Sequence, residues 1–211
     1  MNTENIRNME FEQIRNEVYA ALRQLYEKDI VLFDNAVGEW SISAYLFFYL
    51  KTSKKLERYC IDVEYNKMTK GNVFNGQQLK KRMENGSTVR PDIIIHQRKP
   101  NTNLLWIEMK LFHSKESLND DIEKLKSVVR EYEKDVEYVT GYHLGLSIVL
   151  GKCGGCCTWI LANRDKGAIH ERFCVGNDGN IKIIENTKQR CSECEFEDCR
   201  LVKIKGDNNL V

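Results

Sequence analysis

The apolar positions at the start of the chain recur with the spacing of an α-helix. Between residues 9 and 28 they fall at i, i+3, i+4 and i+7, which places them on one helical face. These positions are Phe11, Ile14, Val18, Ala21, Leu22 and Leu25. A second helix is expected after Gly38, where residues 40–49 form a broad apolar face that becomes basic between Lys51 and Arg58. The first 58 residues are therefore predicted to be mainly helical.

The pattern then changes to the alternation of β-strands. Residues 59–65 alternate and are rich in β-branched and aromatic side chains, as is typical of a strand. Two apolar runs, residues 91–96 and 104–110, flank the turn-forming residues 100–103 and predict an antiparallel hairpin. Between these elements, residues 67–89 are expected to form a loop that contains a short basic helix over 77–83.

Helical spacing returns in residues 117–134, and strand patterns follow it. Leu118, Ile122, Leu125, Val128 and Val129 share one helical face. Residues 143–150 and 157–162 predict two further strands, and residues 181–184 a weaker one. This order of elements is typical of an α/β or α+β fold with a mixed sheet. A chain of 211 residues fits one domain, so residues 1–211 are expected to form a single domain.

Composition and charge restrict the possible functions of the protein more than they restrict its possible folds. The 32 Lys and Arg nearly balance the 31 Asp and Glu, which excludes a uniformly basic nucleic-acid coat protein. Between residues 51 and 110, however, thirteen Lys and Arg stand against six Asp and Glu, a local charge of +7. The N-terminus lacks the apolar core of a signal peptide, and the longest apolar stretch, residues 45–50, is too short to span a membrane. A cytoplasmic protein without a membrane partner is expected.

Charged residues interrupt the apolar hairpin at positions that suit metal chemistry. Asp92 begins the first strand, and Glu108 and Lys110 point to the same face of the second because strand side chains alternate. Neighbouring carboxylates repel each other unless a hard cation such as Mg²⁺ lies between them. A lysine beside that cation could position or deprotonate a water, or neutralise a scissile phosphate. The alternative is that Asp92 caps a turn while Glu108 and Lys110 form a surface ion pair.

This hairpin resembles the motif of the PD-(D/E)XK nuclease superfamily. The similarity is carried by the stretch VRPDIIIHQRKPNTNLLWIEMK, which contains the PD dipeptide and the ExK sequence. Residues 39–46 also resemble the first helix of that family, and residues 121–125 resemble the helix that follows ExK. The resemblance implies a restriction-endonuclease-like αβββαβ core over residues 36–163. An N-terminal helical extension, residues 1–35, would precede this core, and a Cys-containing appendage, residues 164–211, would follow it.

The resemblance also implies hydrolysis of phosphodiester bonds with Mg²⁺ or Mn²⁺. Asp92 and Glu108 would hold the metal, and Lys110 would orient or activate the attacking water. Glu39 would hold a second ion or a water of the first; the alternative for Glu39 is an acid stabilised by the helix dipole. Lys124 could approach the site or lie on a solvated face. The expected partner is nucleic acid, with DNA favoured over the alternative, RNA, and a homodimer would suit cleavage of two strands. The alternative is a non-catalytic nucleic-acid-binding subunit that keeps the nuclease fold.

Six of the eight cysteines fall into two clusters. Each cluster contains a C-x₂-C pair, and two such pairs suit a tetrahedral structural Zn²⁺ site. The expected ligands are Cys153, Cys156, Cys191 and Cys194, with Cys199 as an alternate. An iron–sulfur cluster and thiols without a metal are the alternatives. Cys60 and Cys174 stand alone and are expected to be buried thiols.

Overall fold

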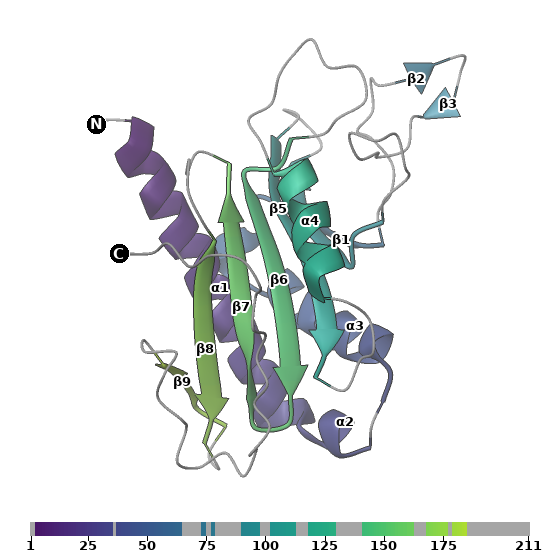
Figure 1. Cartoon of the computed structure of the whole chain (residues 1–211), viewed down its shortest axis with the longest axis vertical. Coiled ribbons are helices and arrows are strands. Elements are labelled where there is room, and N and C mark those ends of the chain that lie inside the picture. Colours follow the sequence, from purple (N-terminus) through teal and green to yellow (C-terminus); the bar gives the residue numbers. More distant parts are fainter. Residues whose placement is uncertain are drawn as a thin grey trace.

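The computed structural model describes residues 3–35, 37–64, 73–74, 77–78, 90–97, 102–112, 118–129, 141–162, 168–176 and 179–184. Figure 1 shows a central sheet with helices on both faces. The helices are α1 (Thr3–Asp29), α2 (Val31–Asp34), α3 (Glu39–Lys51), the 3₁₀ turn η1 (Lys54–Leu56) and α4 (Leu118–Val128). The strands are β1 (Cys60–Val63), β2 (Val73–Phe74), β3 (Gln77–Gln78), β4 (Ile93–Gln97), β5 (Thr102–Leu111), β6 (Leu144–Gly151), β7 (Gly154–Leu161), β8 (Ile169–Val175) and β9 (Ile181–Ile184).

Within the described residues, seven strands form one mixed sheet in the order β1-β4-β5-β6-β7-β8-β9, and β2 and β3 pair separately. The β5–β6 pair is parallel, and the other pairs in this sheet are antiparallel. Parallel neighbours need a crossover connection, which here includes α4. The predicted α/β class with a mixed sheet is therefore confirmed. In chain order, α3, β1, β4, β5, α4 and β6 follow one another, with β2 and β3 between β1 and β4. The restriction-endonuclease-like core stays a prediction.

Helices α1 and α3 cover one face of the sheet. The apolar stripe of α1 enters the core there, and the ring of Phe11 packs edge-on against that of Trp159, with centroids 5.4 Å apart. A carboxylate on β8 anchors the helix further. Glu171 accepts hydrogen bonds from Arg15 Nε at 2.7 Å, from Tyr19 Oη at 3.0 Å and from Trp159 Nε1 at 2.9 Å. Because three donors satisfy it, this partly buried charge holds α1 to β7 and β8.

Helix α4 covers the opposite face, over β5 and β6 (Figure 1). Its buried residues Leu125 and Val128 pack with Trp106 of β5, whose ring meets that of Tyr142 edge-on at 5.1 Å. The helix approaches β6 closely at Gly145. A Cβ atom there would lie 2.6 Å from Val129 Cγ2, so the missing side chain permits this packing.

The structure corrects several sequence expectations. Helix α1 begins at Thr3, before the first buried apolar residue, and the short helix α2 was not expected. Gln77 and Gln78 form a strand, so the helix expected over 77–83 does not begin there. Strand β8 was missed, and with β9 it extends the sheet beyond β7. Within the described ranges, no helix is long and apolar enough to cross a membrane.

Candidate functional site

The site lies where β5 extends beyond its neighbour β4. The β4–β5 ladder ends at the pair Ile93–Ile107, whereas β5 continues to Leu111 with β6 alongside it. Two backbone N–H groups of this extension turn towards side chains instead of another strand. Met109 N donates to Asp92 Oδ2 at 2.7 Å, and Leu111 N donates to Glu39 Oε2 at 3.3 Å. Because β5 extends beyond β4, these two N–H groups have no acceptor on β4 and need another one. The carboxylates of Asp92 and Glu39 supply it.

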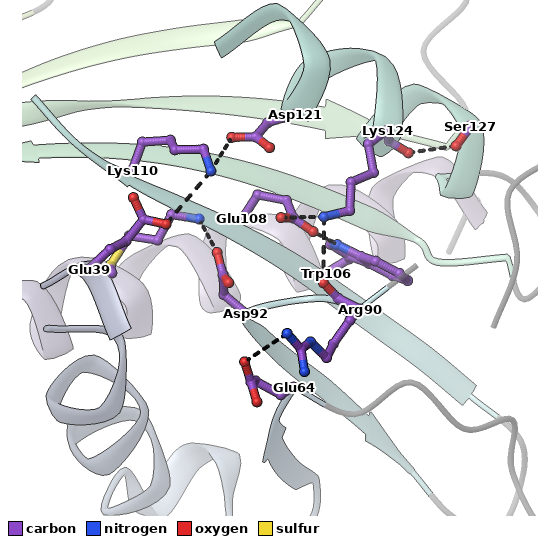
Figure 2. Close-up of polar contacts among 11 residues, drawn as sticks. Glu39, Glu64, Arg90, Asp92, Trp106, Glu108, Lys110, Asp121, Lys124 and Ser127 are labelled. Atoms are coloured by element: carbon purple, nitrogen blue, oxygen red, sulfur yellow. Dashed lines mark hydrogen bonds and ion pairs between the residues drawn. The ribbon is translucent and has the colours of Figure 1, made fainter. Parts of the chain in front are cut away.

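Glu108 and Lys110 point from β5 towards α4, on the same face as Trp106 (Figure 2). Glu108 is only 3% exposed; it accepts a hydrogen bond from Trp106 Nε1, and its Oε2 lies 2.6 Å from Lys124 Nζ. Lys110 Nζ lies 3.6 Å from Glu39 Oε1 and 3.7 Å from an oxygen of Asp121 on α4. Helices α3 and α4 thus contribute charges to β5 from opposite faces of the sheet.

The electrostatic balance of this cluster is negative. The carboxylates of Glu39, Asp92, Glu108 and Asp121 face the ammonium groups of Lys110 and Lys124. When all six groups are ionised their formal charge is −2, which one divalent cation would neutralise.

Burial shifts the protonation of the two central acids. Removal from water raises the pKa of Asp92 above its ordinary value, although the N–H of Met109 and the charge of Lys124 oppose this rise. Burial also raises the pKa of Glu108 to about 7; the nearby charge of Asp92 adds to the increase, and Lys124 opposes it. The surrounding cations thus compensate only partly for the burial of these two carboxylates.

The four residues predicted from the motif come together in the structure. Glu39 contacts Lys110, Asp92 is bonded to the residue after Glu108, and Glu108 and Lys110 share a face. Sequence reasoning missed Asp121 as a site residue and left Lys124 undecided. A signal for Asp121 was present, because residues 121, 125 and 128 have the i, i+4, i+7 spacing of one helical face. An acid among the apolar residues of such a face is costly to bury unless it has a partner.

The donor atoms suit a hard divalent cation. Among the described residues, no three His, Cys, Asp or Glu side chains form a group that could hold a metal ion. Mg²⁺ usually binds to only one or two carboxylates and completes its shell with water and substrate phosphate. Asp92 and Glu108 offer carboxylate oxygens, the kind of ligand that Mg²⁺ prefers, and burial raises the pKa values of both. For a cation to bind Glu108 Oε2, the ammonium group of Lys124 would have to move away from that oxygen.

The cysteines fall in two parts of the chain, and only one part is described. Cys153 lies in the turn between β6 and β7, and Cys156 lies in β7. The other expected ligands, Cys191 and Cys194, and the alternate Cys199 lie outside the described residues. The zinc site therefore stays a prediction.

The two solitary cysteines differ from expectation. Cys60 and Cys174 are partly exposed, so the prediction that they are buried thiols is wrong. Of the five cysteines that the structure describes, Cys157 is the buried one, on the face of β7 that packs against α1.

No protein-family model, curated protein or solved structure matches the chain. The assignment to the PD-(D/E)XK superfamily therefore stays a prediction from the sequence motif.

Proposed function

We propose that this protein is a divalent-metal-dependent nuclease that hydrolyses phosphodiester bonds in DNA. The observation that carries the proposal is the pair of carboxylates Asp92 and Glu108, which have raised pKa values and lie close to Lys110, Asp92 directly before β4 and Glu108 on the adjoining β5. Structural ion pairs shift pKa values too, but buried acids with perturbed pKa values beside a charged partner are candidates for a functional site.

Each residue of the cluster would have a separate role in hydrolysis. Asp92 and Glu108 would hold Mg²⁺ or Mn²⁺, which would neutralise charge on the scissile phosphate. Lys110 would orient the attacking water through its ammonium group. The Glu39 carboxylate, 3.6 Å from that ammonium, would accept the proton as the water oxygen bonds to phosphorus. The bond from phosphorus to the leaving oxygen then breaks, and solvent protonates that oxygen.

Charge on the surface near α3 supports a polyanionic substrate. Lys51, Lys54 and Arg58 are exposed and follow one another at the end of α3 and around η1. They belong to the segment 51–110, whose net charge is +7. Lysine and arginine bind phosphates without reading sequence, so this segment would position a DNA strand rather than select a site.

One contact favours a second function, a nucleic-acid-binding subunit that does not cut. Lys124 Nζ lies 2.6 Å from Glu108 Oε2, so an ammonium already compensates part of the charge on this carboxylate. If that ion pair persists when metal is added, the cluster would serve structure and binding rather than hydrolysis.

Cleavage of plasmid and linear DNA with Mg²⁺ or Mn²⁺ tests the proposal. We expect the wild type to cut, and expect Asp92→Asn and Lys110→Ala to lose at least about a hundredfold in rate. Asparagine at 92 keeps an acceptor for Met109 N, so a loss of activity would reflect charge and not a broken strand edge. The matched control is Lys126→Ala, which removes an exposed lysine of α4 outside the site and should leave the rate unchanged.

Two results would contradict the nuclease assignment. If wild type and both site variants cut equally, the activity does not come from this cluster. If the wild type binds DNA with a strong salt dependence and never cuts it, the non-catalytic function is correct.

A further inference from the structure

Helix α3 carries a row of aromatic side chains on its outer face. Trp40 is 67% exposed, Phe48 is 55% exposed and Tyr45 is 40% exposed. The opposite face of the helix is buried in the core through Ile42, Leu46, Tyr49 and Leu50. Large aromatic rings at this exposure are unusual on the outside of a helix whose inner face already fills the core, and exposed aromatic surface of this kind marks a binding site.

The row follows the helix axis. Trp40 and Phe48 are eight residues apart, and Lys51 lies three residues further, so all three project from one side of α3. At 1.5 Å per residue, the two rings are offset by about 12 Å along the axis. The ring of Phe48 also packs edge-on against Tyr49, with centroids 5.4 Å apart, which holds it in place. Tyr45, five residues from Trp40 and so about 140° round the helix, lies at the border of this side. We call Trp40 and Phe48 the aromatic row.

The two ends of the aromatic row have different chemistry. At its start, Trp40 directly follows Glu39, whose carboxylate contacts Lys110 and Leu111 in the candidate site. At its other end lie the exposed cations Lys51, Lys54 and Arg58. The row therefore connects an acidic hydrolytic site to a basic surface. A ligand that matches this sequence of features carries both flat apolar groups and repeated negative charge.

We propose that the aromatic row binds a single strand of nucleic acid, with bases stacked on Trp40 and Phe48 and phosphates paired with the cations at the end of α3. Stacking needs unpaired bases with exposed ring faces, which a single strand offers and an intact duplex does not. The inference rests on the proposed function, because it takes the strand to enter the acidic site past Trp40. It adds the substrate form: a single strand, or a duplex end that has opened.

Intrinsic fluorescence gives a direct test. The protein has three tryptophans, and Trp106 and Trp159 are fully buried, so a strand added in solution can stack only on Trp40. With EDTA present to prevent cleavage, a 20-residue oligothymidylate should quench the emission of Trp40. A strand of the same length and charge with abasic sugars should quench it little, because it has phosphates but no bases. Equal quenching by the two strands would overturn the stacking.

Variants measure the contribution to affinity. Trp40→Ala and Phe48→Ala should each weaken binding of oligothymidylate about tenfold, with no comparable change for the abasic strand. The matched control is Val31→Ala on α2, which removes another exposed apolar side chain and should change neither affinity. Circular dichroism should show both ring variants folded, since exposed side chains contribute little to stability. Unchanged affinity in both folded ring variants would refute the proposal.

The outcomes separate this inference from the nuclease assignment. Metal-dependent cleavage together with unchanged strand binding in Trp40→Ala would refute the aromatic row alone. Stacking on Trp40 in a protein that never cuts would refute the nuclease alone. Tighter binding of duplex than of single strand, or a wild-type dimer that Trp40→Ala converts to a monomer in sedimentation, would assign the row to duplex or to a subunit interface and overturn the proposal.

Discussion

Replacing Glu108 with glutamine should stabilise the protein at pH 8 and leave its stability nearly unchanged at pH 4. In the wild type, burial raises the pKa of Glu108 from 4.5 to about 7. The folded state therefore holds this proton more tightly than the unfolded state does. The stability that this proton contributes is complete below pH 4.5 and is lost as pH rises through 7. Glutamine stays neutral at every pH and so avoids this loss.

The magnitude follows from the difference in proton affinity. A rise in pKa from 4.5 to about 7 corresponds to about 3 kcal/mol, at roughly 1.4 kcal/mol for each tenfold change in affinity. The Glu108→Gln variant should therefore gain about 3 kcal/mol over the wild type when both are moved from pH 4 to pH 8. Groups that do not interact with Glu108 titrate alike in both proteins, and their contributions cancel in the comparison.

Urea unfolding at pH 4, 6 and 8, followed by circular dichroism, measures this difference. The matched control is Glu123→Gln on α4, whose side chain is 70% exposed, so its free energy of unfolding should stay within about 0.5 kcal/mol of wild type at each pH. A Glu108→Gln difference that is constant with pH would show that burial does not perturb this carboxyl. A difference that shrinks towards pH 8 would show that Lys124 overcompensates its burial.

Two further substitutions test the packing that positions the site. Gly145→Ala should lose about 1–3 kcal/mol in urea unfolding because its Cβ would lie 2.6 Å from Val129, whereas Gly151→Ala, whose nearest contact would be 3.5 Å, should change little. Glu171→Ala should lower the free energy of unfolding by about 2–4 kcal/mol in the same assay, because it leaves buried donors unpaired. Glu12 is the exposed partner of the same residue, Arg15, and Glu12→Ala should cost less than about 1 kcal/mol. Equal losses within either pair would contradict the packing described.

The elements with strong periodicity could be predicted from the sequence. The apolar run in residues 91–96 and its partner at 104–110 predicted the β4–β5 hairpin, and residues 143–150 predicted β6. Strand β8 was missed because three polar residues in its first half, His170, Glu171 and Arg172, hide its alternation. The glutamate in that strand accepts a hydrogen bond from Arg15, which lies 156 residues earlier in the chain. A partner so distant leaves no local signal.

The same distinction applies to the candidate site. Asp92, Glu108 and Lys110 could be predicted because one hairpin carries all three, and strand alternation fixes their relative directions. Asp121 and Lys124 reach the site because of where α4 packs along β5 and β6. Gly145 permits this position, since it has no side chain to keep the helix away. The position of a helix over a sheet depends on tertiary packing. The spacing of residues along α4 could therefore indicate which of them share a face, but not which strands that face would contact.

The contact between α1 and β8 has a consequence for synthesis on the ribosome. Arg15 and Glu171 are 156 residues apart, and at roughly 5–20 residues per second about 8–30 s separate the synthesis of the two. During that interval the apolar stripe of α1 has been made, but the strands that cover it have not. Folding of this sheet must therefore finish late, after most of the chain has emerged. Until β8 has been made, the nascent α1 lacks the carboxylate that anchors it in the folded protein.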